Sequence, residues 1–245
     1  MSGFHTTHWT AVLAAKEPGA EGLQQARLLC ETYYQPVLNF IRRTVTISPF
    51  QYGSQDAGDL THGFFIRVMQ GKEFRHLERN HGRFRSYLLG AVKYFLADVR
   101  EKASAQRRGG KGQLVSPSLL PETDIASAAE SDARFDKDWA ESLVSRAVNE
   151  LRLEADRSGT GRQFDVLRHW LVGDSKESSR EESAAVLGIT KEYFKVQVSR
   201  LRKKFRLLVH REIAATVDSE SNISAELDYL IQVLRQVCPP QKFFP

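Results

Sequence analysis

The chain has 245 residues, of which 41% are hydrophobic and 10% aromatic, so it can bury a core and is not expected to be globally disordered. Its longest apolar runs are only a few residues, which excludes a membrane-spanning helix, and MSGFHTTHWT at the start lacks the pattern of a secretion signal. The formal net charge is +5, and the two distant cysteines, Cys30 and Cys238, match no disulfide or metal-binding spacing, so we expect a protein of the reducing cytoplasm.

The charged residues are segregated along the chain. Residues 66–111 contain twelve Lys or Arg against four Asp or Glu, and residues 190–211 contain eight against one. Between these basic blocks, residues 112–165 contain six basic and eleven acidic residues. Such segregation favours a polyanionic partner such as nucleic acid, although a solvated helix face can look similar.

Apolar residues in the first hundred positions recur at helical spacing. They predict three helices, from Leu23 to Ile41, from an entry at Asp59 to Met69, and from Arg83 to Lys102. One β-branched run, RTVTI at 43–47, is the single strand signal. We therefore predict a helical N-terminal domain over residues 1–105.

The remainder of the chain predicts a linker, a second helical domain and an extension. Residues 106–137 are rich in Gly, Ser, Pro and acidic residues, as in an exposed flexible linker, and the GGKG within them lacks the spacing of a phosphate-binding loop. Helical spacing resumes at Trp139 and predicts a domain over residues 138–215. In the extension, residues 216–245, ISAELDYLIQVL predicts a short amphipathic helix with Ile231 on its apolar side. The predicted fold class is all-α, with two helical domains joined by a flexible linker.

The segment SREESAAVLGITKEYFKVQVSRLRKKFR, residues 179–206, predicts two helices joined by a glycine turn. Ser179 and Glu182 have the spacing of a capping box, Gly188 suits a left-handed helix end, and Thr190 suits a second N-cap. The second helix carries its apolar side chains on one face: Phe194, Val198, Leu201 and Phe205. This is the helix-turn-helix pattern, whose second helix lies in the DNA major groove. The alternative is an ordinary helical hairpin with a solvated basic face, which the scarcity of interleaved acidic residues disfavours.

Residue types on the second helix suggest how it would contact DNA. Arg200 suits a bidentate contact to guanine, and Ser199 and Gln197 could reach base edges. Four lysines are predicted to contact phosphates, which position the helix without reading sequence: Lys191, Lys195, Lys203 and Lys204.

The same segment resembles the promoter-reading C-terminal domain of extracytoplasmic-function (ECF) RNA polymerase sigma factors. Their pattern is Ser-x-Glu-Glu-Ile-Ala, then Leu-Gly-Ile-Ser, then Val-Lys and Arg-x-Arg-Lys. Here Ser183 replaces the usual apolar residue, and Tyr193-Phe194 replaces the commoner Thr-Val. By position, the resemblance implies that Val196, Ser199 and Arg200 read the −35 element.

The N-terminal half resembles the same family. DAGDLTHGFFIRVM is similar to the Asp-Leu-x-Gln-x-Phe-Phe helix that docks on the polymerase clamp, with His62 in place of Gln. GRFRSYLLGAVKYFLADVREKA is similar to the helix that melts and reads the −10 element. The resemblance implies polymerase contacts by Asp59, His62, Arg67 and Gln70, and single-strand contacts by Arg83, Arg85, Lys93 and Tyr94. For Tyr94, a partly buried surface aromatic is an equal alternative. The likeness covers about residues 5–215, and TTHWTAVLAA and FDKDWAESLV resemble an ECF-like subgroup of planctomycete-type bacteria.

The resemblance implies a cytoplasmic, nucleoid-associated sigma factor that directs core RNA polymerase, bound through its clamp and flap, to promoter DNA. An anti-sigma factor or other regulator is a further expected partner. The histidines are scattered and no nucleophile or dinucleotide motif is present, so we expect no metal, no cofactor and no enzymatic activity of the chain itself. Two alternatives remain open: a helix-turn-helix repressor or activator that binds duplex DNA alone as a dimer, and a helical adaptor that binds an acidic protein.

Overall fold

The computed structural model describes residues 20–47, 52–70, 83–107, 125–171, 177–214, 216–217 and 221–237. Every regular element in these residues is helical, and an isolated bridge joins Arg83 to Val217, so the all-α fold class is confirmed. None of the helices in these ranges is both long and apolar enough to cross a membrane. The chain divides into two compact units: unit 1 is Met1–Trp139 with Ala215–Asn222, and unit 2 is Ala140–Ala214 with Ile223–Pro245.

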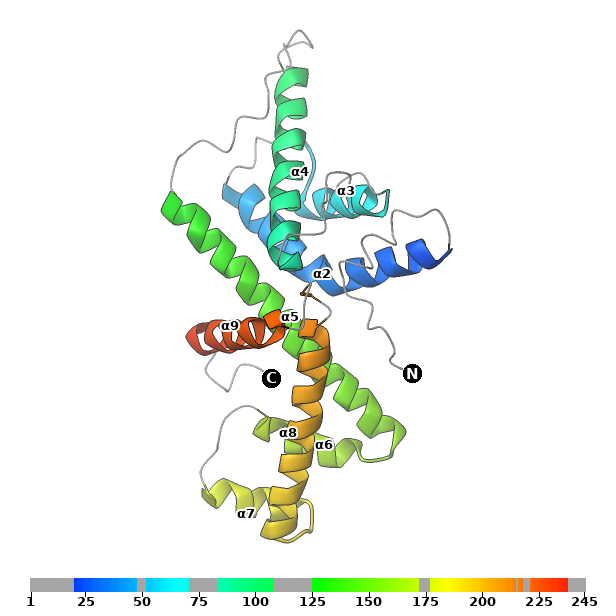
Figure 1. Cartoon of the computed structure of the whole chain (residues 1–245), viewed down its shortest axis with the longest axis vertical. Coiled ribbons are helices and arrows are strands. Elements are labelled where there is room, and N and C mark those ends of the chain that lie inside the picture. The colour runs from blue at the N-terminus through cyan, green and yellow to red at the C-terminus, as the bar shows by residue number, and fades with distance from the viewer. Residues whose placement is uncertain are drawn as a thin grey trace. The chain divides into compact units, whose positions relative to one another are not determined.

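Unit 1 contains α2 (Ala20–Ile47), α3 (Ala57–Met69), α4 (Phe84–Arg107) and the first part of α5 (Ile125–Arg157) (Figure 1). The first three of these helices contain the three helical segments predicted from the N-terminal sequence. Their apolar stripes form the core, which includes Tyr33, Val37, Ile41, Leu60, Phe64, Leu88, Val92 and Phe95. Burial of these faces against one another stabilises the unit through the hydrophobic effect.

The only strand signal in the sequence lies in a helix. Residues 43–47 form the last turn of α2. The hydroxyl of Thr44 donates a hydrogen bond to the carbonyl of Phe40 at 2.9 Å, and that of Thr46 donates to the carbonyl of Arg42 at 2.8 Å. Threonine side chains can therefore follow the helix by bonding to carbonyls four residues earlier, and the β-branched run is helical, as the predicted all-α fold requires.

Helix α3 begins two residues earlier than predicted. Its N-cap is Asp56, whose carboxylate accepts a hydrogen bond from the backbone N–H of Asp59 at 2.8 Å. The Asp59 carboxylate in turn accepts from the backbone N–H of Asp56 at 3.3 Å. Asp59 is thus the second partner of a reciprocal capping box rather than the entry residue.

The prediction of a flexible linker over residues 106–137 is wrong for those residues of the range that the structure describes. Residues 106 and 107 end α4, residues 108–124 lie outside the described ranges, and α5 begins at Ile125. Phe135 is buried with its ring edge-on to Phe40, with the centroids 6.0 Å apart, and Trp139 is buried one turn further on. Two large apolar residues at i, i+4 are enough to dock this acidic helix, although the many small and charged residues around them obscure the periodicity.

Unit 2 contains the rest of α5, α6 (Gly161–Leu167), the 3-10 turn η2 (Arg168–Trp170), α7 (Glu177–Val186), α8 (Lys191–Ala214) and most of α9 (Ser221–Val237). Two groups of buried side chains among the described residues contribute to its core. One contains Leu167, Trp170, Ala184, Phe194 and Val198. The other contains Leu151, Ala155, Phe164 and Leu171.

Helix α9 confirms the amphipathic helix predicted in the C-terminal extension, although one residue predicted on its apolar side is exposed. Ile223, Leu230 and Val233 are buried along one side of the helix. Ile231 is 39% exposed because it lies one position, about 100° of helical rotation, away from Leu230.

Candidate nucleic-acid interface

The turn between α7 and α8 is closed by a complete helix-capping motif. Gly188 has a φ of +64°, the left-handed conformation that glycine adopts at low cost. Its N–H donates to the carbonyl of Ala185 at 3.0 Å, and the N–H of Ile189 donates to the carbonyl of Ala184 at 3.1 Å. These two bonds define a Schellman motif, and they confirm the role predicted for Gly188.

The predicted start of α8 is confirmed, whereas that of α7 is not. The Thr190 hydroxyl accepts a hydrogen bond from the backbone N–H of Tyr193 at 3.2 Å, as an N-cap does, and α8 begins at Lys191. Helix α7 begins at Glu177, so Ser179 lies inside the helix rather than capping it. The turn and the second cap, which set the position of α8, are the parts predicted correctly.

Packing fixes which face of α8 is turned to solvent. Phe194 is fully buried, and its ring meets that of Trp170 edge-on, with the centroids 5.5 Å apart. Val198 is buried one turn further along α8. The guanidinium of Arg202 donates through Nε to the carbonyl of Trp170 at 2.8 Å. These contacts leave the opposite side of the helix exposed.

Three of the four predicted base-reading residues lie on this exposed face. Val196 is 43% exposed, and Ser199 and Arg200 are also exposed. Gln197 is only half-exposed, because it lies at the side of α8 that faces α5 and α6. The resemblance-based set of Val196, Ser199 and Arg200 therefore shares one surface, which Gln197 borders.

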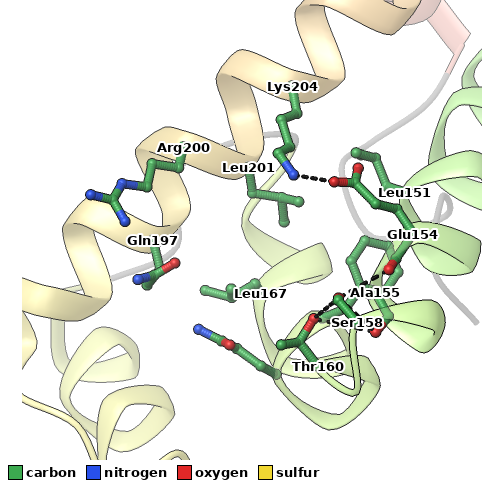
Figure 2. A pocket seen from close by; sticks show the side chains of 12 residues that line it. Leu151, Glu154, Ala155, Ser158, Thr160, Leu167, Gln197, Arg200, Leu201 and Lys204 are labelled. Atoms are coloured by element: carbon green, nitrogen blue, oxygen red, sulfur yellow. Dashed lines mark hydrogen bonds and ion pairs between the residues drawn. The ribbon is translucent and has the colours of Figure 1, made fainter.

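The four lysines predicted to contact phosphates divide into two pairs. Lys195 and Lys203 are exposed and form no ion pair with any described residue. Lys191 is 2.6 Å from the carboxylate of Glu181, and the hydrogen bond and charge of Lys191 lower the pKa of Glu181. Lys204 pairs with Glu154 of α5 (Figure 2). Two of the four charges are thus already partly compensated.

A pocket of about 340 Å³ lies along the side of α8 that carries Lys204. Its wall includes Glu154, Ser158 and Thr160 from the end of α5 and the turn after it. Figure 2 shows Lys204 reaching Glu154, while Arg200 extends away from that ion pair. The wall therefore contributes a carboxylate and two hydroxyls, and its chemistry is mixed rather than cationic.

The single-strand contact predicted for Arg85 is contradicted by its burial. Arg85 is 2% exposed, and its Nε lies 2.9 Å from the carboxylate of Asp136. Its guanidinium also lies 4.9 Å from the centre of the Trp139 ring. A guanidinium enclosed by a carboxylate and an indole serves the packing of α5 on α4 and is not available to a DNA phosphate.

The other residues predicted to contact single-stranded DNA have different surroundings. Lys93 is half-buried and lies 2.5 Å from the carboxylate of Asp132, so its charge is also partly compensated. Arg83 is half-buried at the bridge to Val217. Tyr94 is 59% exposed, which leaves its ring accessible and is compatible with both alternatives.

The residues predicted to contact polymerase lie along α3. Asp59, His62 and Gln70 are exposed, and Nε2 of His62 lies 3.0 Å from the hydroxyl of Tyr34. Arg67 is half-buried and lies 2.5 Å from the carboxylate of Asp98, with its guanidinium 5.1 Å from the centre of the Phe95 ring. Arg67 therefore contributes to the packing of α3 on α4.

Two carboxylates in unit 1 and three cations in unit 2 were not among the site residues predicted from the sequence. Asp132 and Asp136, in the predicted linker, compensate the charges of α4. Arg180, Arg202 and Arg206 line a second pocket beside α8. The i, i+4 spacing of Asp132 and Asp136 was the only local signal for the first pair, and no local signal distinguished the three arginines from other basic residues.

Comparison with known proteins gives no match: no family description, curated protein or solved structure corresponds to the chain. Within the described ranges, no group of three or more His, Cys, Asp or Glu side chains could hold a metal ion.

Proposed function

We propose that the chain is an RNA polymerase sigma factor and that unit 2 recognises duplex promoter DNA through α8. The observation that carries this proposal is the exposed face of α8. Four cations on and beside that face form no ion pair with a described residue: Lys195, Arg200, Lys203 and Arg206. They lie on the second helix of a pair closed by the Gly188 turn.

The arrangement suits the dimensions and charge of a major groove. The groove admits one α-helix, whose exposed side chains can reach base edges while neighbouring cations contact phosphates. Ser199 and Arg200 supply polar groups on the outward face, and Val196 supplies an apolar contact such as a thymine methyl accepts. Lys195 and Lys203 supply uncompensated positive charge beside them.

The extension from a DNA-binding protein to a sigma factor rests on the sequence resemblance in α3 and α4. The structure supports it with an exposed surface on α3 of mixed character. Beside the polar Asp59 and His62, Ile66 is 49% and Met69 is 40% exposed. Exposed aliphatic side chains beside polar groups on one helix suit contact with a protein.

The residues to which we assign strand opening differ from those predicted from the sequence. Of the four predicted residues, Tyr94 is the one with an accessible aromatic ring, on which an unpaired base could stack. Arg85 is assigned to the fold of unit 1 instead. The polymerase, and not this chain, performs the chemistry of transcription.

The decisive experiment is reconstitution. The purified chain is mixed with bacterial core RNA polymerase, the complex is isolated by size-exclusion chromatography, and transcripts are mapped on genomic DNA from the source organism. We expect a stoichiometric complex and initiation at defined start sites. A Lys203→Glu, Arg200→Glu variant should still bind polymerase but lose initiation. Absence of a complex with polymerase would contradict the proposal.

One observation favours a second candidate, a regulator that binds duplex DNA without polymerase. Arg85 and Lys93 are engaged by carboxylates of α5, which leaves unit 1 with fewer cations for single-stranded DNA than a strand-opening role would use. This candidate predicts tight, sequence-specific duplex binding by the free chain, measurable by fluorescence anisotropy, and no complex with core polymerase.

A further inference from the structure

The two sides of α8 differ in charge, and the difference points to a binding site that lies beside the base-reading face and shares only Ser199 with it. On the side that carries Lys195 and Arg206, a pocket of about 240 Å³ lies between α8, η2 and the start of α7. On the other side lies the pocket that contains the Lys204–Glu154 pair (Figure 2). Both pockets belong to unit 2.

The first of these pockets, here called the cationic groove, is lined by four basic side chains. They are Arg180, Lys195, Arg202 and Arg206, with the hydroxyl of Ser199 among them. No carboxylate from the described residues lines it. Two of these cations, Lys195 and Arg206, are exposed and form no ion pair with a described residue, so the groove offers their charges to an anion.

The shape of the groove selects phosphate rather than a nucleobase. Its floor is formed by Trp170, Phe194 and Val198, which are all buried. The guanidinium of Arg180 covers the Trp170 ring at 5.5 Å from its centre, and the ring of Phe194 meets Trp170 edge-on. No aromatic face in the groove is open for a base to stack on, whereas the rim offers N–H and O–H donors that suit phosphate oxygens.

The groove is long enough to suit several successive phosphates of one strand better than a single phosphate. Lys195, Ser199, Arg202 and Arg206 follow one another along the same side of α8. From the first to the last, the helix rises about 16 Å at ~1.5 Å per residue. One free phosphate can bridge only neighbouring members of this row, whereas successive phosphates of one strand can contact all of it.

We propose that the cationic groove binds the sugar–phosphate backbone of one DNA strand beside α8, with Lys195 and Arg206 as its main electrostatic contacts. This inference rests on the proposed function, since it assumes that α8 lies in a major groove. It also changes the assignment of phosphate contacts. Arg206 joins them, and Lys204, which is paired with Glu154, contributes less.

The test measures the salt dependence of binding by the full chain to a random-sequence duplex, because phosphate contacts do not depend on sequence. Fluorescence anisotropy between about 50 and 200 mM salt gives the slope of log K against log[salt]. Lys195→Ala and Arg206→Ala should each reduce the magnitude of the slope by about 1, and the double variant by about 2. Lys204→Ala should reduce it by less than either.

The matched control is Arg157→Ala, which removes an exposed arginine of unit 2 that lies outside the groove. It should leave the slope unchanged. If Arg157→Ala and Arg206→Ala lower the slope equally, the groove is not a distinct site and the inference is overturned. If the wild-type chain binds no duplex at any salt concentration, alone or with polymerase, the proposed function fails as well. Normal wild-type binding with unaltered slopes for both groove variants overturns the inference alone.

A second measurement separates a DNA strand from a free phosphate as the source of the anion. Calorimetric titration with inorganic phosphate should show no saturable binding below about 1 mM, because one phosphate contacts only part of the row. Saturable submillimolar binding that Arg206→Ala abolishes would instead identify a small-molecule site and overturn the assignment to a strand. Glu154→Gln frees Lys204 on the opposite side and should raise duplex affinity a few-fold without affecting the groove.

Discussion

Cations of the two basic segments differ in their surroundings in the structure. In α4 of unit 1, Arg85 and Lys93 each lie against a carboxylate of α5. In α8 of unit 2, Lys195, Arg200 and Lys203 extend into solvent and form no ion pair with a described residue. The sequence presents both as blocks of excess positive charge.

This difference shows that an excess of charge in the sequence does not by itself identify a nucleic-acid surface. A cation with a carboxylate partner across a helix interface has less charge to offer a phosphate, and a buried one cannot be reached at all. A cation on an exposed face with no partner retains its charge for a polyanion. We therefore assign the main surface of the proposed DNA interface to unit 2.

The variant with the largest expected effect tests whether Arg85 stabilises the fold of unit 1. Arg85→Met should lower the free energy of unfolding of unit 1 by about 3 kcal/mol, because it removes a buried guanidinium that pairs with the Asp136 carboxylate and breaks this ion pair. Urea denaturation followed by circular dichroism measures the loss, and hydrogen exchange can assign it to α4. The double variant with Asp136→Leu should recover much of it, whereas Lys93→Met should cost less than about 1 kcal/mol. Equal losses for Arg85→Met and Lys93→Met would contradict a structural role specific to Arg85.

The next effect concerns base reading by α8. Arg200→Ala should weaken binding to a preferred promoter by about 1–3 kcal/mol and relax the preference at one base pair. Selection from a randomised duplex library, in the presence of core polymerase, measures the change in preference. A uniform loss of affinity on every sequence would mean that Arg200 contacts phosphate instead.

A direct comparison of the two basic segments gives a smaller effect. Lys203→Ala should reduce the magnitude of the salt slope for duplex binding by about 1, because it removes an uncompensated charge. Lys93→Ala should change the slope much less, since Asp132 already neutralises part of its charge. Equal changes in slope would mean that the ion pair with Asp132 opens when DNA binds, and the contrast between the segments would be lost.

The smallest effect concerns acid stability in unit 1. Burial of Asp98 acts to raise its pKa, but hydrogen bonds from Lys102 and Arg67 and their charges outweigh burial, so the pKa lies below the ordinary value of 3.8. The folded state therefore binds this proton less readily, and the stabilisation is present above pH 3.8 and is lost as the pH falls further. Asp98→Asn should flatten the fall in stability below that pH, by less than about 1 kcal/mol. Parallel acid-denaturation curves for the two proteins would exclude this contribution.

Local chemistry made the helices and the α7–α8 turn predictable. The left-handed conformation of Gly188 and the N-cap at Thr190 depend on residues within one turn of each other, as does the apolar spacing of Phe194 and Val198. Burial of that apolar face then leaves Val196, Ser199 and Arg200 outside. For this part of the candidate site, the sequence was sufficient to predict which side chains are exposed.

Non-local contacts made the rest unpredictable. Lys93 and Asp132 are 39 positions apart, and Arg85 and Asp136 are 51 apart, so no periodicity joins them. The same holds for α5, whose first half has the composition of a linker but packs within unit 1 through the buried Phe135 and Trp139.

The sequence alone therefore determined the all-helical fold, the turn before α8 and the face of α8 that meets solvent, because each depends on interactions within a few residues. Only the tertiary structure decided which positive charges are compensated, where α5 begins, and which side of α8 forms a groove that no described carboxylate lines. Those features depend on side chains from distant segments, which become neighbours only after the helices have packed.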